Sequence, residues 1–244
     1  DYCAQSRAFM PHFHIPLQSG SDEVLKLMHR RYDKALFAHK VNLIKEKMPD
    51  AFIGVDVMVG CRGETPECFE ECYEFLKSLP VTQLHVFPYS ERPGTAALKI
   101  PYVVSDKDKK LRSKRLLELS DEKTQAFYAQ YIGTEAEVLF EKAPRGKAMH
   151  GFTKNYVRVE LSPALAKEEY DNQLIKVKLG DFNHDKVAKS EFATPQVTMA
   201  DKDSMTNAKV NPAPGIKTSA NKTEDEVDFD KMNADPRVKM GAYN

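Results

Sequence analysis

The chain has 244 residues, and its hydrophobic fraction of 41% is enough to pack one large domain or two smaller ones. Lysine plus arginine and aspartate plus glutamate both number 36, so the net charge indicates no particular partner. No apolar run approaches the roughly 18 residues that a membrane-spanning helix needs, and the sequence shows no secretory signal pattern. We therefore expect a cytoplasmic protein without a membrane partner.

The first 90 residues alternate between strand-like and helix-like patterns. Strands are predicted at 12–17, 52–60 and 82–90, and helices at 22–28, 37–48 and 66–79. The predicted strands are apolar and partly β-branched, whereas the helices repeat apolar residues at helical spacing. Ser19-x-x-Asp22 and Thr65-Pro66 are signals for the start of a helix. The alternation predicts an α/β fold with a parallel sheet.

Each predicted strand ends in glycine, small hydroxyl-bearing and charged residues. The three endings read "LQSGSD", "VGCRGET" and "PYSERPGT". One such ending is ordinary punctuation between a strand and a helix. Because the carboxyl ends of parallel strands share one edge of a sheet, and ligands bind at that edge, three of them together predict a ligand-binding rim.

The cysteines are Cys3, Cys61, Cys68 and Cys72. Cys68-x-x-x-Cys72 is similar to part of a metal-binding motif, but no third thiol is near it in the sequence. Its spacing places both side chains on one side of the predicted helix, beside apolar neighbours. We therefore predict buried free thiols in a reducing compartment, and no metal ligands.

Residues 105–131 predict one long helix, with Ser105-x-x-Asp108 as a capping box and Gly133 beyond its end. The first half of this helix, "DKDKKLRSKR", is basic. Two interpretations stay open for it: a solvated helix face, or a contact with RNA.

After Gly133 the sequence changes to short strands with period-two alternation, at 134–141, 155–161 and 172–180. Turn-forming "APRG" and "LSP" lie between them, which predicts a small antiparallel β-barrel of the OB-like kind. Basic and aromatic side chains on such a barrel suit RNA, because they attract phosphates and stack on bases. The predicted RNA-binding residues are Lys142, Arg145, Lys147, Lys154, Tyr156, Arg158, Lys176 and Lys178.

From residue 191 onward the composition is polar and shows no sustained periodicity, which predicts a disordered tail. The predicted domains are 1–104 for the sheet and its helices, 105–133 for the connecting helix, 134–190 for the barrel and 191–244 for the tail.

Three long stretches resemble a known family: "HFHIPLQSGSDEVLKLMHRRY", "IGVDVMVGCRGET" and "HVFPYSERPGTAA". Followed by a small β-barrel, they are similar to the radical S-adenosylmethionine tRNA methylthiotransferases, most closely to the branch that acts on threonylcarbamoyladenosine. The resemblance covers about residues 1–190. It implies that 1–104 is the last three strands of a partial radical-SAM (β/α) barrel, and that 134–190 is a TRAM domain, an RNA-binding module.

The resemblance also implies contacts with S-adenosylmethionine. Gln18 and Ser19 would face its ribose or amino-acid end, and Phe87 and Tyr89 would flank its adenine. Asp56, Gly60 and Glu64 would lie beside the adenine and ribose. Where many family members carry Phe-Pro, this chain has Cys61-Arg62. No residue is predicted to be catalytic.

Family members hold [4Fe–4S] clusters, one of them through a CxxxCxxC motif that this sequence lacks. The resemblance therefore implies the C-terminal part of an enzyme that adds a methylthio group to C2 of N6-threonylcarbamoyladenosine at position 37 of tRNA, in the anticodon loop. We expect the chain to be inactive alone and to bind neither cofactor tightly. The alternatives are a non-catalytic RNA-binding protein with a TRAM barrel, or an unrelated α/β protein with a small-molecule site. DNA is not an expected partner.

Overall fold

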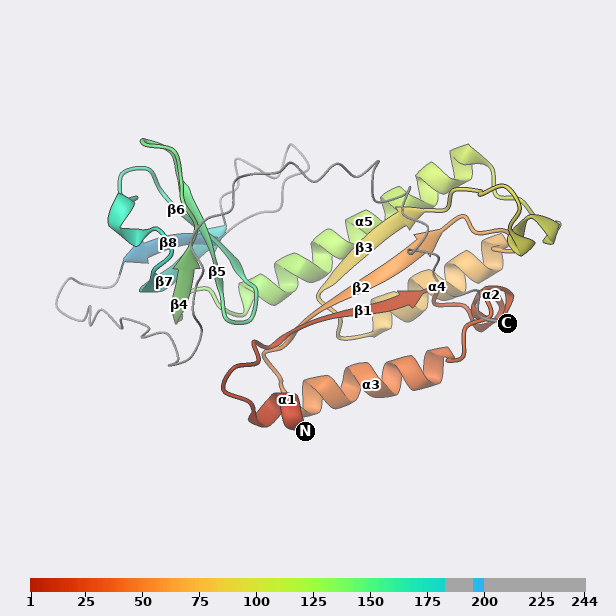
Figure 1. The fold of residues 1–244 in the computed structure, drawn as a ribbon, viewed down its shortest axis with the longest axis horizontal. Coiled ribbons are helices and arrows are strands. Elements are labelled where there is room, and N and C mark those ends of the chain that lie inside the picture. The colour runs from red at the N-terminus through yellow and green to blue at the C-terminus, as the bar shows by residue number, and fades with distance from the viewer. Residues whose placement is uncertain (183–194, 200–244) are drawn as a thin grey trace, which may run out of the picture. The chain divides into compact units, whose positions relative to one another are not determined.

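The computed structural model describes residues 1–182 and 195–199. These residues form a three-stranded sheet with flanking helices, followed along the chain by a five-stranded barrel (Figure 1). None of the helices in this part of the chain is both long enough and apolar enough to cross a membrane.

The predicted parallel sheet is confirmed. Its strands are β1 (His12–Gln18), β2 (Phe52–Val59) and β3 (Gln83–Pro88), in the order β1-β2-β3, and both pairings are parallel. The helices of this part are α1 (Tyr2–Gln5), α2 (Asp22–Leu27), α3 (Lys34–Lys47), α4 (Pro66–Ser78) and the short 3₁₀ helix η1 (Ala96–Lys99).

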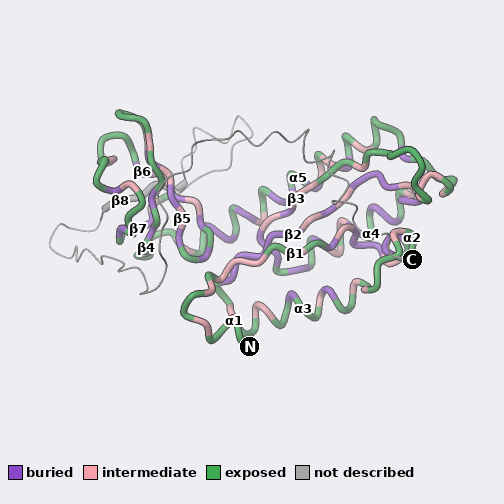
Figure 2. Tube along the Cα trace, viewed as in Figure 1, coloured by how far each residue is buried: buried purple, intermediate pink, exposed green. Residues whose placement is uncertain are grey.

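The two faces of the sheet differ because strand side chains alternate. Ile53, Val55 and Val57 of β2 are fully buried, in a core that also holds Leu76 of α4. On the opposite face of β2, Asp56 is only partly buried. Figure 2 shows β2 as the most continuously buried strand of this sheet. One sheet face therefore forms the core, and the other carries polar side chains.

The helix starts follow the sequence signals except at α2. Thr65 Oγ1 accepts a hydrogen bond from Cys68 N at 3.3 Å, as the Thr65-Pro66 signal predicts. Ser19 does not cap α2, so that prediction is wrong: its hydroxyl accepts from Ser21 N at 3.2 Å, and Ser21 is the N-cap residue. The chain turns at Gln18, which has a positive φ of 72°, before the helix begins.

Helix α5 (Asp106–Ala129) confirms the predicted long helix. Ser105 Oγ accepts a hydrogen bond from Asp108 N at 3.1 Å, so the predicted cap is present. Along β3, Leu84 N donates to Ser120 Oγ at 2.9 Å, and this hydroxyl donates to Leu84 O at 3.2 Å. Side chains of α5 therefore take the place of a neighbouring strand at this point of the sheet edge.

The barrel has five strands: β4 (Glu135–Phe140), β5 (Met149–Thr153), β6 (Arg158–Leu161), β7 (Leu174–Phe182) and β8 (Pro195–Met199), with the 3₁₀ helix η2 (Glu168–Tyr170) between β6 and β7. It is closed in the order β4-β5-β6-β8-β7. Its core contains Val138, Phe140, Val159, Leu161 and Val177, together with Phe52 of β2.

The barrel differs from the prediction in four respects. Strand β5 was not predicted, and β6 begins at Arg158 because Tyr156 has a φ of 66° that interrupts the extended chain. The pairing of β6 with β8 is parallel, so the barrel is not wholly antiparallel. Strand β8 lies in the segment predicted as a disordered tail, so that prediction is wrong for 195–199. The rest of that prediction, at 191–194 and 200–244, lies outside the described residues.

Candidate functional site

The carboxyl ends of the three parallel strands form a rim, as the sequence predicts. Gln18 is in register with Val57, and Val59 with Pro88. Tyr89 N, just after β3, donates to Val59 O at 2.8 Å. The three polar endings are therefore neighbours in space, although they are about 70 residues apart in the sequence.

Glu64 braces this rim from inside. Its carboxylate is buried. Gly60 N donates to both carboxylate oxygens, each at a distance of 3.1 Å. Arg112 Nη1 of α5 lies 2.5 Å from Glu64 Oε1 and donates to Glu64 O at 2.9 Å. Burial raises the pKa of Glu64, and Arg112 opposes that shift. The carboxylate predicted to contact a cofactor therefore holds the β2–α4 loop against α5.

Arg62, which stands in place of the family's proline, ties two rim loops together. Its Nε lies 2.7 Å from Glu91 Oε1, and its Nη1 donates to Leu98 O at 2.8 Å and to Ile100 O at 3.1 Å. The departure "CRG" thus has a structural role in fixing the β3–α5 loop. The sequence could not show this, because the partners of Arg62 lie 29 to 38 positions away.

The turn after β1 is fixed to α4 rather than open to solvent. Ser19 is 1% exposed. Gly20 N donates to Cys72 Sγ at 3.1 Å, and a side chain on Gly20 would come within 2.9 Å of the Cys72 backbone. Gln18 is the partly accessible side chain at this end of β1. Of the two residues predicted to face the cofactor from the end of β1, Ser19 is buried and Gln18 is partly accessible.

The described thiols do not fit an iron–sulfur cluster. Cys68 and Cys72 are buried in α4, which confirms the prediction of buried helix cysteines. Burial raises the pKa of both Cys61 and Cys72 to about 12, whereas cluster ligands are thiolates. Within 1–182 and 195–199, no group of three or more His, Cys, Asp or Glu residues is placed to hold a metal ion.

The polar face of the sheet carries a cluster of histidines that the sequence reasoning missed. His14 Nε2 lies 2.5 Å from Asp56 Oδ1, and the His14 ring stacks on that of His85 with centroids 4.6 Å apart. Burial, followed by the neighbouring histidines, lowers the pKa of His12. The alternation in "HFHIP" was the available signal, because period two places His12 and His14 on one face.

Asp56 therefore lies on the sheet face beside imidazoles, in register with Pro16 and His85, before the end of β2. Phe87 is on the same face, in register with Met58, and is 52% exposed. Tyr89 is half-buried against a small cluster that contains Cys61. Among the predicted cofactor residues, Gln18 and Phe87 present the most accessible side chains, and Gly60 supplies backbone.

Five of the seven basic residues predicted to bind RNA fall into two groups, whereas Lys154 follows β5 and Arg158 begins β6. On the barrel wall, Lys176 pairs with Glu135 at 2.6 Å, and Lys178 is in register with the same glutamate. In the β4–β5 loop, Lys142, Arg145 and Lys147 line a pocket of about 480 Å³. Positive charge is therefore balanced on the wall and concentrated in the loop.

Tyr156, predicted to bind RNA, lies in an aromatic stack. Its ring stacks on His12 with centroids 4.0 Å apart and on Phe152 at 4.7 Å, in nearly parallel planes. The tyrosine ring is therefore part of an aromatic stack, although the residue stays 40% exposed. Its edge also contacts Phe52. Tyr156 joins the barrel to β1 and β2.

Comparison with known proteins agrees with this rim. Residues 4–76, which include β1 and β2, match the family model of the Radical SAM superfamily. The chain is 36% identical over 179 residues to the threonylcarbamoyladenosine tRNA methylthiotransferase MtaB of Bacillus subtilis, a match that covers 72% of this chain and 39% of that protein. It is 41% identical over 150 residues to the protein of the same name from Aquifex aeolicus, a match that covers 62% of this chain and 35% of that protein. A tRNA-2-methylthio-N(6)-dimethylallyladenosine synthase of Oleidesulfovibrio alaskensis is 41% identical to it over 142 residues. That match covers 58% of this chain and 31% of the synthase.

The sheet and the family match agree on the class: residues 4–76, which hold β1 and β2, are similar to the Radical SAM superfamily. More narrowly, the chain is related to the radical S-adenosylmethionine tRNA methylthiotransferases, which confirms the resemblance seen in its motifs. It matches between 31% and 39% of the length of these three relatives.

Proposed function

We propose that this chain supplies the C-terminal part of a tRNA methylthiotransferase that modifies C2 of N6-threonylcarbamoyladenosine at position 37, in the anticodon loop of tRNA. The observation that carries the proposal is the rim, where three parallel strands end side by side with Gln18, Gly60 and Tyr89. The names of the two MtaB relatives support the threonylcarbamoyladenosine branch. Since tRNA is modified where it is made and used, we place the protein in the cytoplasm.

In this proposal the rim binds and orients S-adenosylmethionine. The Gln18 amide would hydrogen-bond the ribose or amino-acid end, and the exposed Phe87 ring would contact the adenine. When bound, the cofactor supplies the methyl group and, with a reduced cluster, the radical. Ser19 and Glu64 act indirectly, because their polar atoms hold the loops that shape the rim.

We further propose that the chain is inactive alone. The sequence has no CxxxCxxC motif, and Cys61 and Cys72 are buried thiols. The cluster that activates S-adenosylmethionine would need thiolates that these residues do not provide.

The barrel is proposed as a TRAM domain that binds tRNA mainly through the β4–β5 loop. Lys142, Arg145 and Lys147 lie together there, and no ion pair is found for them within the described residues. The basic half of α5 is a weaker candidate, because Arg112 is tied to Glu64 and Arg115 to Glu70.

Two measurements test the proposal. Fluorescence titration of an unmodified tRNA transcript should show binding. The logarithm of the association constant should fall linearly with the logarithm of the salt concentration. Changing Lys142, Arg145 and Lys147 to Ala should reduce that slope by about one unit per lost phosphate contact. Lys176→Ala is the matched control, because Glu135 already neutralises that lysine. An equal effect of the control would place the RNA surface elsewhere.

The second measurement separates the enzyme part from a non-catalytic RNA-binding protein. Titration with millimolar S-adenosylmethionine should shift the amide NMR signals of Gln18, Gly60 and Phe87, and Phe87→Ala should weaken the shifts. The binding of tRNA without any shift at the rim would favour the non-catalytic alternative. That alternative is supported by Ser19 and Glu64, two predicted cofactor ligands whose polar atoms already form hydrogen bonds within the protein.

A further inference from the structure

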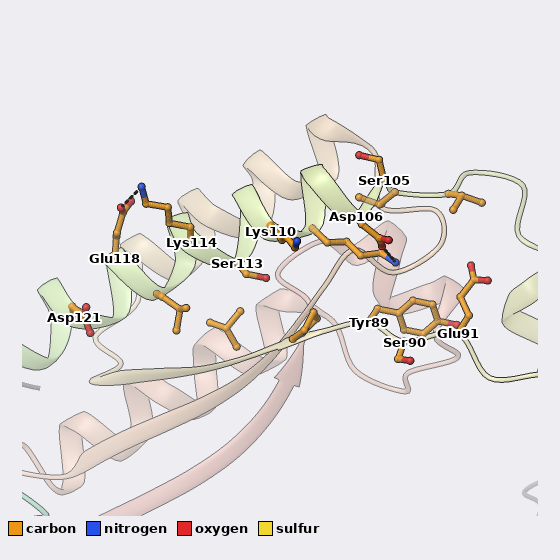
Figure 3. Close-up of a pocket in the computed structure, with 16 residues that line it drawn as sticks. Tyr89, Ser90, Glu91, Ser105, Asp106, Lys110, Ser113, Lys114, Glu118 and Asp121 are labelled. Atoms are coloured by element: carbon orange, nitrogen blue, oxygen red, sulfur yellow. Dashed lines mark ion pairs between the residues drawn. The ribbon is translucent and has the colours of Figure 1, made fainter. Parts of the chain in front are cut away.

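A groove lies between the edge of β3 and the first half of α5, on the outer side of the sheet (Figure 3). Its volume is about 1160 Å³. Apolar surface comes from Val86 of β3, from Val103 in the loop before α5 and from Leu117 of α5. Val103 and Leu117 are 52% and 49% exposed. The groove meets the rim at Pro88, Tyr89 and Glu91, but most of its lining comes from α5 and the loop before it, and it includes neither Gln18 nor Phe87.

The strand edge beside this groove is only partly satisfied. In a parallel strand, the N–H and C=O of one residue point to the same side, and the side alternates along the strand. Tyr89 N bonds to β2, whereas Leu84 N and O both bond to Ser120 Oγ of α5. Val86 is two residues beyond Leu84, so its backbone groups point to the same side as those of Leu84. That side is the groove, and no strand occupies it in the described part of the chain.

The opposite wall of the groove carries an unused hydroxyl. Ser113 Oγ is buried and has no hydrogen-bond partner in the structure. Ser113 is seven residues before Ser120, so the two serines share a face of α5 and lie about 10 Å apart along it. Figure 3 shows Ser113 on the side of α5 that faces β3. Ser120 bonds to the strand edge, whereas Ser113 faces the groove at the level where the helix and the strand have separated.

The charges of the groove do not favour nucleic acid. Three lysines and four acidic residues line it: Lys109, Lys110, Lys114, Glu91, Asp106, Glu118 and Asp121. Lys109 pairs with Asp106 at 3.5 Å and Lys114 with Glu118 at 3.7 Å. Within the described residues, Lys110 has no ion pair, which leaves one cation beside an apolar floor.

We propose that the groove binds an extended polypeptide segment as an additional strand on the edge of β3. The main chain of that segment would bond to Val86 N–H and C=O, with Ser113 Oγ as a further partner. Alternate apolar side chains would cover Val103 and Leu117, and an acidic side chain would meet Lys110. An RNA strand has no main-chain amides to pair with a sheet edge, so polypeptide is the occupant that these groups fit. This partner is separate from tRNA and goes beyond the function proposed above.

The test begins with selection of a random 12-residue phage-displayed peptide library on the immobilised full chain. We expect enriched peptides with alternating apolar residues and at least one acidic residue. Synthetic copies should bind Leu117→Lys at least 10-fold more weakly than the unchanged protein. Leu111→Lys is the matched control, because Leu111 lies on the same helix, is 56% exposed and does not line the groove. It should change the affinity by less than 2-fold.

Two further readouts localise the peptide. Ser113→Ala should weaken binding about 2- to 10-fold, the effect of one ordinary hydrogen bond. Hydrogen exchange of the Val86 amide should slow at least 10-fold in the complex. Absence of enriched peptides, equal binding to Leu117→Lys, or unchanged exchange at Val86 would each overturn the proposal. Displacement of the peptide by a 12-nucleotide single-stranded RNA at similar concentration would also overturn it, because the groove would then serve nucleic acid.

Discussion

Replacing Arg112 by methionine is expected to destabilise the protein strongly, because the Glu64 carboxylate stays buried without its cation. The two side chains are 8% and 4% exposed. Removing one partner of a buried ion pair costs about 3–5 kcal/mol. Since Gly60 N still donates to both Glu64 oxygens, we expect the lower end of this range, about 3 kcal/mol in the free energy of unfolding at pH 7.

The loss should become smaller in acid. Burial raises the pKa of Glu64, and the hydrogen bond from Arg112 is the largest influence that lowers it. The variant therefore has a Glu64 pKa still further above its unfolded value. A carboxyl with a raised pKa in the folded state contributes most below the unfolded pKa, and its contribution is lost as the pH rises through the folded pKa. The difference between variant and unchanged protein is thus greatest at neutral pH and shrinks towards pH 5.

Urea unfolding followed by far-UV circular dichroism measures these energies, since the chain has no tryptophan for fluorescence. Arg115→Met is the matched control: its pair with Glu70 is 36% and 54% exposed, so the loss should be about 0–1 kcal/mol. Adding Glu64→Gln to Arg112→Met should recover much of the stability, because no buried charge remains. A loss below about 1 kcal/mol for Arg112→Met, or no recovery in the double variant, would refute the brace described for the rim.

Three further predictions concern the cluster, the barrel and its junction with the sheet. After anaerobic treatment with iron and sulfide, the chain should hold no stoichiometric [4Fe–4S] cluster; a four-iron spectrum with 5′-deoxyadenosine formation above that of a cysteine-free variant would contradict this. Changing both Lys154 and Arg158 to Ala should flatten the salt dependence of tRNA binding by about two units of slope, and an unchanged slope would remove them from the RNA surface. Tyr156→Gly should be more stable than Tyr156→Ala by about 1–3 kcal/mol, because only glycine accepts a φ of 66° without strain, whereas both lose the ring contacts. Equal stability of these two variants in urea unfolding would argue against the left-handed backbone at Tyr156.

Much of the sheet could be predicted from the sequence because its signals are local. Thr65-Pro66 and Ser105-x-x-Asp108 mark helix starts through bonds that span three residues. The apolar run of β2 reflects burial on a parallel sheet. Strand β5 escaped prediction because "MHGFT" is short, contains Gly151 and has no long alternating run. Glycine is needed there, since any side chain would come within 2.5 Å of the Leu139 backbone.

The candidate site was less predictable because its partners are distant in sequence. The sequence located Glu64 on the rim but not Arg112, which is 48 positions away and turns a possible cofactor ligand into a brace. Ser19 read as a cap, but the positive φ of Gln18 depends on the bulge between β1 and β2. No local pattern carries that information. Position on the rim was therefore predictable, whereas the availability of each polar group was not.

Availability also decides between the two interpretations of the basic stretch at the start of α5. A count of lysines and arginines there favours RNA, but a cation that already has a carboxylate partner gains less from a phosphate. Arg112 and Arg115 pair with Glu64 and Glu70, which ties α5 to the β2–α4 loop and to α4. In the β4–β5 loop, by contrast, Lys142, Arg145 and Lys147 share one pocket, and within the described residues no carboxylate pairs with them. The tRNA backbone is therefore expected to follow this loop, while Arg112 of α5 holds the rim through Glu64.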